Sequence, residues 1–310
     1  MESIFSVLPQ KLKDVLQQLS ATQLQAIEEI RIRIGRPLEI AMGGKFQLLP
    51  MIVAEEDAAQ LLSKLTHFSM YTMEEELKRG YITIDGGHRV GIAGKVILDK
   101  GYVKAIAHIS SFNIRIAREK VGCAEHLLPY LYRQGWYSTL IIGPPQTGKT
   151  TLLRDLARVI SSGIVTPAHT LSAWKVGIVD ERSEIAGCVR GVPQLQFGSR
   201  VDVLDACPKA EGMMMLIRSM SPDVIVADEI GRSEDTVSVL EAVNAGIKLM
   251  ITTHGSSLEE VVKRPTIKYL IDLQVFSRFV ILSRDEQSGF SYKVLDAQGK
   301  SLLLERSVKV

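Results

Sequence analysis

The chain has 310 residues, of which 46% are hydrophobic and 23% are charged, so it can hold one large folded domain or two smaller ones. Its formal net charge of +2 at pH 7 is too small to argue for nucleic acid or an acidic membrane surface as a partner. Three widely spaced cysteines show neither a disulfide framework nor a zinc spacing, which favours a reducing cytosol. No window reaches the roughly 18–20 uncharged apolar residues of a membrane span, so any membrane role is expected to be peripheral.

Residues 1–118 are expected to form a compact α+β domain. Charged and apolar residues alternate from 29 to 34, which is typical of a half-buried strand, and Asp-Gly and Lys-Gly turns between later alternating runs predict hairpins. The expected helices are two short ones within 8–30, joined and capped at 20–22, followed by helices at 55–65 and 70–78. The expected strands are 29–34, 38–42, 81–84, 89–98, 102–106 and 113–116.

Residues 119–310 are expected to form a second domain. A connecting helix or linker over 119–135 leads into alternating strands and helices, which predict a parallel sheet with right-handed crossovers and ligands at the carboxyl ends of its strands. The expected strands are 140–142, 175–179, 223–227 and 248–252, and the expected helices are 149–161, 209–220, 233–245 and about 257–264. Residues 275–310 are expected to form antiparallel strands.

The segment GPPQTGKTT matches the phosphate-binding pattern G-x-x-x-x-G-K-[ST] at every fixed position, between an expected strand and an expected helix. Backbone N–H groups at the start of that helix can surround a phosphate, Lys149 can reach the β- and γ-phosphates, and the Thr150 hydroxyl can ligate Mg²⁺. The residues thus predict ATP and Mg²⁺ as cofactors. The predicted cofactor-binding residues are Gly143, Pro144, Pro145, Gln146, Thr147, Gly148, Lys149, Thr150 and Thr151.

Further polar residues follow three of the other expected strands. Asp228, after strand 223–227, is expected to hold Mg²⁺ together with Thr150, and Glu229 is expected to polarise the attacking water. Glu181, in the acidic cluster after strand 175–179, is a rival for the role of catalytic base. His254, at the end of the fourth strand, is expected to sense the γ-phosphate or to touch a neighbouring subunit.

The order of these segments resembles the secretion ATPase family that powers type II secretion and type IV pili. The matching segments are GPPQTGKTT, VGIVDERSEI, IRSMSPDVIVADEIGR and LMITTHGSS. Other segments are similar to a sporulation branch of that family in endospore-forming bacteria, and they span about residues 29–255: RIRIGRPL, GYITIDGGHRVGIAGK, SFNIRIARE, VDERSEIAG and DVLDACPKAEGMMMLIRSMSPDVIVADEIG. The implied fold is α/β, a RecA-like P-loop NTPase domain with a parallel-core sheet over 119–310, preceded by a smaller α+β domain over 1–118.

The resemblance implies an ATP-hydrolysing motor that forms a homohexamer. It implies a mother-cell cytoplasmic protein, peripheral at the outer forespore membrane, whose partners are the membrane proteins of a secretion-like sporulation channel; no nucleic-acid partner is expected. In this family, arginines of the amino-terminal domain complete the nucleotide site. The matching positions are Arg89, Arg115 and Arg118. The predicted catalytic residues are Arg115 and Arg118 together with Lys149, Glu181, Glu229 and His254.

The residues alone leave other functions open. A RecA-like nucleic-acid-dependent ATPase would need a basic groove or stacking aromatic residues, and the chain is only 6% aromatic. A small-molecule kinase would use the same loop and bind its substrate on the β-rich domain. A nucleotide-gated scaffold would bind ATP without turning it over.

Overall fold

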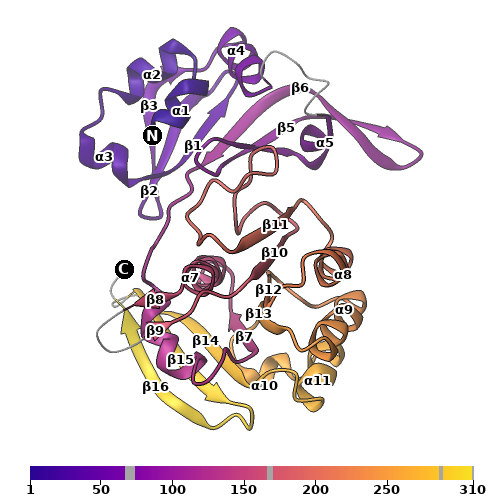
Figure 1. The fold of residues 1–310 in the computed structure, drawn as a ribbon. Helices are drawn as coiled ribbons and strands as arrows, with labels where there is room; N and C mark the ends of the chain where they lie inside the picture. Colours follow the sequence, from indigo (N-terminus) through magenta and orange to yellow (C-terminus); the bar gives the residue numbers. More distant parts are fainter. Residues whose placement is uncertain (67–73, 166–169, 286–288, 309–310) are drawn as a thin grey trace. The chain divides into compact units, whose positions relative to one another are not determined.

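The computed structural model describes residues 1–66, 74–165, 170–285 and 289–308, which divide into two compact units (Figure 1). The first unit contains Met1–Arg118 and Gly187–Arg190, and the second contains Glu119–Ala186 and Gly191–Val310. The buried apolar side chains of each unit come from that unit alone, so each has its own core.

The first unit is built on a six-stranded antiparallel sheet with the order β3-β2-β1-β6-β5-β4. Its strands are β1 Ile27–Arg33, β2 Pro37–Met42, β3 Lys45–Ile52, β4 Tyr81–Ile84, β5 His88–Asp99 and β6 Tyr102–Arg115. Its helices are α1 Glu2–Val7, α2 Gln10–Leu16, α3 Ala21–Ala26, α4 Glu55–Leu65 and α5 Glu74–Arg79. Apolar side chains of α1, α2 and α4 pack in one core with the alternating inward residues of the strands, such as Ile30 and Ile32.

The helices of the first unit differ in part from the expected pattern. The two short helices expected within 8–30 are confirmed as α2 and α3, whereas α1 was not predicted. Pro9 separates α1 from α2, and the chain becomes strand at Ile27. The predicted cap is confirmed, since Ser20 accepts the backbone N–H of Gln23 at 3.2 Å. Helix α4 has the expected bounds, and the expected helix at 70–78 is α5, with residues 70–73 outside the described part.

The strands of this unit differ from the expected ones in two places. Strand β3 was not predicted, because its outward-facing residues Phe46 and Leu48 are apolar and hide the usual alternation. The separate strands expected at 102–106 and 113–116 are one 14-residue strand, β6. Its middle residues lack a clear alternation but pair with β5 through a bulge near Gly94.

The second unit is built on an eight-stranded sheet with the order β11-β10-β12-β13-β7-β14-β15-β16. Neighbours from β11 to β14 are parallel, and β14-β15-β16 are antiparallel. Its strands are β7 Thr139–Gly143, β10 Val176–Asp180, β11 Val201–Asp205, β12 Val224–Ala227, β13 Lys248–His254, β14 Arg278–Asp285, β15 Gly289–Asp296 and β16 Ser301–Val308, with a separate pair, β8 Ile164–Val165 and β9 Thr170–Leu171. Its helices are η2 Glu125–Leu127, α6 Leu128–Leu131, α7 Lys149–Ser162, α8 Lys209–Ser219, α9 Ser233–Asn244, α10 Leu258–Val261 and α11 Pro265–Asp272.

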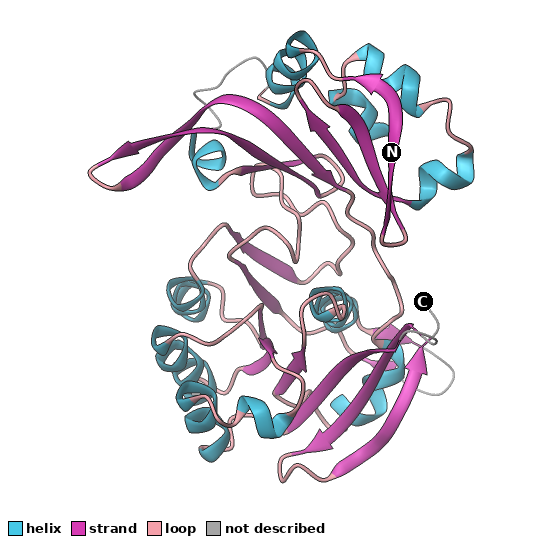
Figure 2. Ribbon diagram, turned by 180° about the vertical axis from the view of Figure 1, so that it is seen from behind, coloured by secondary structure: helices cyan, strands magenta, loops and turns pink. Residues whose placement is uncertain are grey.

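Helices cover both faces of this sheet (Figures 1 and 2). Successive residues of a strand point to opposite faces, so Ile141 packs with α7 in one core, whereas Leu140 and Ile142 pack with α8, α9 and α11 in the other. The α/β fold with a parallel core is therefore confirmed.

Three details of the second unit differ from the prediction. Strand β11 was not predicted, because its sequence VDVLD carries two aspartates. The helix expected at about 257–264 is only the short α10, and Pro265 starts a further helix, α11. Strand β14 is not purely antiparallel, since one of its edges pairs in parallel with β7.

The strand order brings the predicted motifs to one edge of the sheet. Strand β7 leads into the phosphate loop, its neighbour β13 ends at His254, and the next strand, β12, leads into Asp228. His254 lies directly opposite Gly143 in the register of β13 with β7.

Candidate functional site

The phosphate loop connects the buried strand β7 to helix α7. Gly148 caps α7 in the left-handed region, with φ 82°, and Gln146 has φ 63°. A Cβ at Gly143 would lie 2.5 Å from the hydroxyl oxygen of Thr147, so only glycine fits there. Thr147 and Lys149 both donate to the carbonyl of Pro144, at 2.8 Å and 2.9 Å. The loop is thus closed on itself, with its free N–H groups at the start of α7.

Thr150 and Asp228 meet at the start of α7. The Thr150 hydroxyl donates to one oxygen of the Asp228 carboxylate at 2.8 Å, and the Thr252 hydroxyl on β13 donates to the other. A hydroxyl and a carboxylate side by side are oxygen donors that fit a small, hard cation such as Mg²⁺. The structure therefore brings together the two predicted metal ligands.

Glu229 adopts an uncommon backbone conformation, with φ 53°. Its backbone N–H donates to the Thr252 hydroxyl at 2.8 Å. Its carboxylate lies 2.8 Å from Nε2 of His254 and 3.2 Å from the guanidinium of Arg182. Backbone strain of this kind is found where the surroundings fix a residue for function.

His254 connects Lys149 to Glu229. Its Nδ1 lies 3.2 Å from the ammonium of Lys149, which only donates, so Nδ1 accepts and Nε2 carries the proton towards Glu229. Burial lowers the pKa of Lys149, while Asp228 and Glu229 act in the opposite direction. These contacts place three of the predicted catalytic residues in one chain of polar side chains.

Asp180 and Glu181, which are adjacent in the acidic cluster at the end of β10, make different contacts. Asp180 is buried and accepts backbone N–H groups of residues 184, 185 and 186 at 2.9, 3.0 and 2.8 Å. Burial raises the pKa of Asp180 to about 6, against the effect of these three hydrogen bonds. Glu181 forms an ion pair with Lys209 and lies 3.8 Å from Arg232. The predicted rival base is thus held by two cations.

The predicted arginines lie in the first unit. Arg118 donates to the carbonyls of Gln25 and Ile27 at 2.7 and 2.8 Å. Arg115 lies 3.8 Å from a carboxylate oxygen of Glu29. Arg89 stacks over the ring of Tyr81, 3.6 Å from its centroid. Their catalytic role stays a prediction.

Sequence reasoning missed several side chains that organise the site. Thr252 lies within the segment LMITTHGSS but had no predicted role, although a hydroxyl two residues before a strand-end histidine was a visible signal. Arg154 on α7 donates to the carbonyls of Glu184 and Ile185, at 2.6 and 2.7 Å. Lys209 pairs with Glu181 from 28 residues away, and no local pattern predicts such a pair.

The sheet and the phosphate loop share the fold of P-loop ATPases of known structure. The pilus retraction motor PilT, solved with bound ADP, matches with a TM-score of 0.61 at 15% identity, covering 92% of this chain and 82% of that chain. The ATPase DotB of Legionella pneumophila matches with a TM-score of 0.56 at 15% identity, covering 92% and 80%.

The family model described as sporulation stage III, protein AA, matches residues 1–302. The stage III sporulation protein AA of Bacillus subtilis (strain 168) is 54% identical over 309 residues, which cover 100% of this chain and 99% of that protein. The chain therefore belongs to the sporulation stage III protein AA family, as its sequence segments predicted. Within the described residues, no helix combines the length and apolar composition that a membrane span requires.

Proposed function

We propose that this protein hydrolyses ATP to ADP and phosphate, with Mg²⁺, at the site formed by the loop 143–151, Asp228 and Glu229. The observation that carries the proposal is the 2.8 Å contact between Thr150 and Asp228. It joins the metal-binding hydroxyl of a phosphate loop to the acidic end of a neighbouring strand, the arrangement on which ATP hydrolysis depends. The ADP bound to the similarly folded PilT supports the proposal.

The proposal gives each side chain a task. The N–H groups at the start of α7 and the ammonium of Lys149 bind the phosphates, while Thr150 and Asp228 hold the cation, which offsets phosphate charge when it is bound. Glu229 orients and polarises the attacking water. Lys149 must give up the Pro144 carbonyl and His254 to reach the phosphates. Because His254 also contacts Glu229, the loss of its contact with Lys149 on phosphate binding changes the surroundings of Glu229, the proposed base.

The direct test is Lys149→Ala. We expect the purified wild-type protein to release phosphate from Mg–ATP, and the variant to lose turnover while its circular dichroism spectrum is unchanged. Lys268→Ala is the matched control, because Lys268 is an exposed lysine paired with Asp272 on α11. Equal turnover in Lys149→Ala and the wild type would refute the proposed site.

The same assay separates the alternatives. A wild-type protein that binds a fluorescent ATP analogue but releases no phosphate would be a nucleotide-gated scaffold. Strong stimulation by single-stranded DNA would favour a nucleic-acid-dependent ATPase, and release only in the presence of an acceptor would favour a kinase.

We further propose that the protein drives a secretion-like channel complex between mother cell and forespore. Membership of the sporulation stage III protein AA family supports the sporulation role, and the fold shared with PilT supports a motor. On this proposal the protein works as a homohexamer at the cytoplasmic face of the outer forespore membrane, docked on membrane proteins of the channel. Light scattering after size exclusion, with and without a non-hydrolysable ATP analogue, tests the hexamer, and a mass that stays at one chain in both would argue against it.

A further inference from the structure

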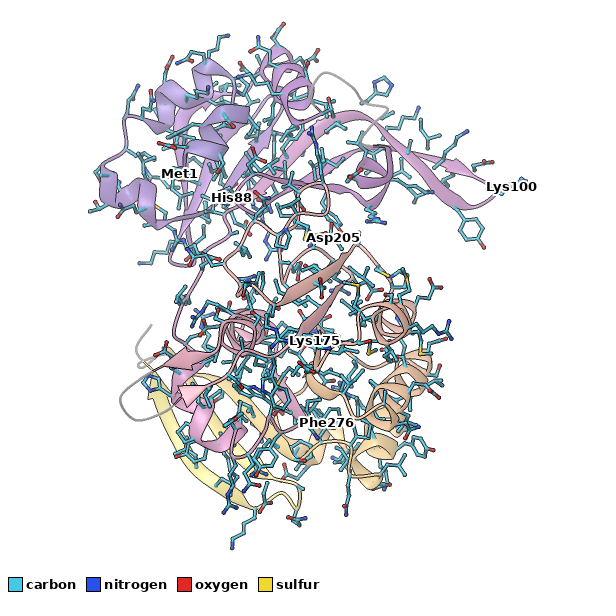
Figure 3. The ribbon with its side chains drawn as sticks, viewed as in Figure 1. Met1, His88, Lys100, Lys175, Asp205 and Phe276 are labelled. Carbon is cyan, nitrogen blue, oxygen red and sulfur yellow. The ribbon has the colours of Figure 1, made fainter. Side chains whose placement is uncertain are left out.

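Strands β5 and β6 continue past the sheet of the first unit as a two-stranded hairpin, and we call residues 95–106 the arm (Figures 1 and 2). Lys100 lies at its tip (Figure 3). The pairs Val96–Ile106 and Leu98–Val103 share one face. The pairs Ile97–Ala105 and Asp99–Tyr102 share the other.

The arm exposes apolar side chains on both faces. The last buried residue of β5 is Ile92 and the first of β6 is Phe112, so no residue of the arm is buried, and Ile106 at its base packs only partly against the core of the unit. Leu98 is 63% exposed and Tyr102, on the opposite face, is 80% exposed. A hairpin with aliphatic and aromatic residues exposed on both faces is costly in water unless something covers it.

A bulge separates the arm from the rest of the sheet. The pairing of β5 with β6 shifts between Ala93 and Lys95, and His108 opposite has φ 45°. A Cβ on Gly94 would lie 2.6 Å from the carbonyl of Ala107, so this turn of the backbone needs glycine. Bulges re-aim and twist a strand pair, and this one sets the direction of the arm.

Most of the charged residues of the arm are positive. Lys95, Lys100 and Lys104 are exposed, and Asp99 is the one acidic residue in the segment 95–106. Within the described residues, none of the three lysines forms a salt bridge. The small net charge of the whole chain therefore hides a local cluster of cations around apolar side chains.

We propose that the arm inserts its tip into the headgroup region of a bilayer that contains anionic phospholipid. A protein partner would cover one face of a hairpin, whereas a lipid surface receives Leu98 and Tyr102 from both faces at once. Tyrosine is favoured at the boundary between apolar and polar layers, and lysine side chains extend back to the phosphates. This inference rests on the arm alone and does not depend on ATP hydrolysis.

The test is flotation of the full chain with vesicles of equal parts phosphatidylglycerol and phosphatidylcholine, compared with phosphatidylcholine alone. We expect binding to the mixed vesicles only, and Lys100→Glu/Lys104→Glu to weaken it about tenfold or more, since each lysine near an anionic surface contributes roughly fivefold. Leu98→Ser/Tyr102→Ser should abolish it. Phe46→Ser/Leu48→Ser is the matched control, because this exposed apolar pair lies on β3, outside the arm.

A spectroscopic readout keeps the test independent of folding. With mixed vesicles, the fluorescence emission of Tyr102→Trp should shift to shorter wavelength, relative to that of the wild type with its two native tryptophans. Binding that ignores phosphatidylglycerol, an equal loss in the β3 control, or no shift from Trp at position 102 would each overturn the proposal. If the mass of Leu98→Ser/Tyr102→Ser in solution without vesicles differs from that of the wild type, the arm makes contacts between copies of the chain instead.

Discussion

At the scale of single residues, Glu229 is held through both its backbone and its side chain. Thr252 fixes its N–H, and His254 and Arg182 flank its carboxylate. We expect Glu229→Gln to lower the rate of ATP turnover about 100-fold or more, since loss of a general base costs on that order. Nucleotide affinity, measured by fluorescence titration, should stay close to that of the wild type.

The control for this assignment is Glu181→Gln. Glu181 is already held by Lys209 and Arg232, so we expect less than about a tenfold loss, well short of the effect of losing a base. If Glu181→Gln loses as much turnover as Glu229→Gln, Glu181 acts as the base together with Glu229 or in its place.

Asp180 gives a prediction about pH and stability. Its pKa is 3.8 as an ordinary carboxyl and about 6 in the folded chain, where burial dominates. Folding therefore takes up a proton between these values, so its contribution to stability is largest below about pH 4 and is lost as pH rises through about 6, a change of about 3 kcal/mol. Asp180→Asn removes this titration. In urea unfolding, the free energy of the wild type minus that of Asp180→Asn should fall from pH 4 to 6 and then level off; a rise would contradict the assignment.

At the scale of elements, hydrogen bonds hold the loop after β10 to the side chains of two neighbouring elements. Asp180 holds its N–H groups, and Arg154 on α7 holds its carbonyls at residues 184 and 185. We expect Arg154→Ala to lower the free energy of unfolding by about 2–3 kcal/mol, because two charge-assisted hydrogen bonds are lost. Arg264→Ala, which removes an exposed pair with Glu260, should cost at most about 0.5 kcal/mol. Equal costs in urea unfolding would mean that Arg154 does not fasten the loop.

The elements also show what local sequence can predict. Strand β7, the glycine loop and α7 were predictable because each signal lies within a few neighbouring residues. Strands β3 and β11 were not, because pairing with β2 and β10 decides their conformation against a weak local pattern. The same limit applies to the site, where the motifs were predictable but contacts such as Thr252 with Asp228 depend on which strands become neighbours.

At the scale of the whole molecule, two sets of core residues with no member in common predict two separate unfolding transitions. The proposed nucleotide site lies wholly in the second unit. A nucleotide at about 100 times its dissociation constant adds roughly 2.7 kcal/mol to the stability of the unit that binds it. In scanning calorimetry, a non-hydrolysable ATP analogue with Mg²⁺ should therefore raise one transition by about 5–10 °C and leave the other in place.

The Lys149→Ala variant decides what such a shift means. It should show the same two transitions without nucleotide and no shift with it, because the phosphates lose their principal cation. A shift that survives in Lys149→Ala would place nucleotide binding elsewhere. A single transition that moves as a whole in the wild type would show that the two cores unfold as one, so that binding energy at the phosphate loop stabilises the entire chain.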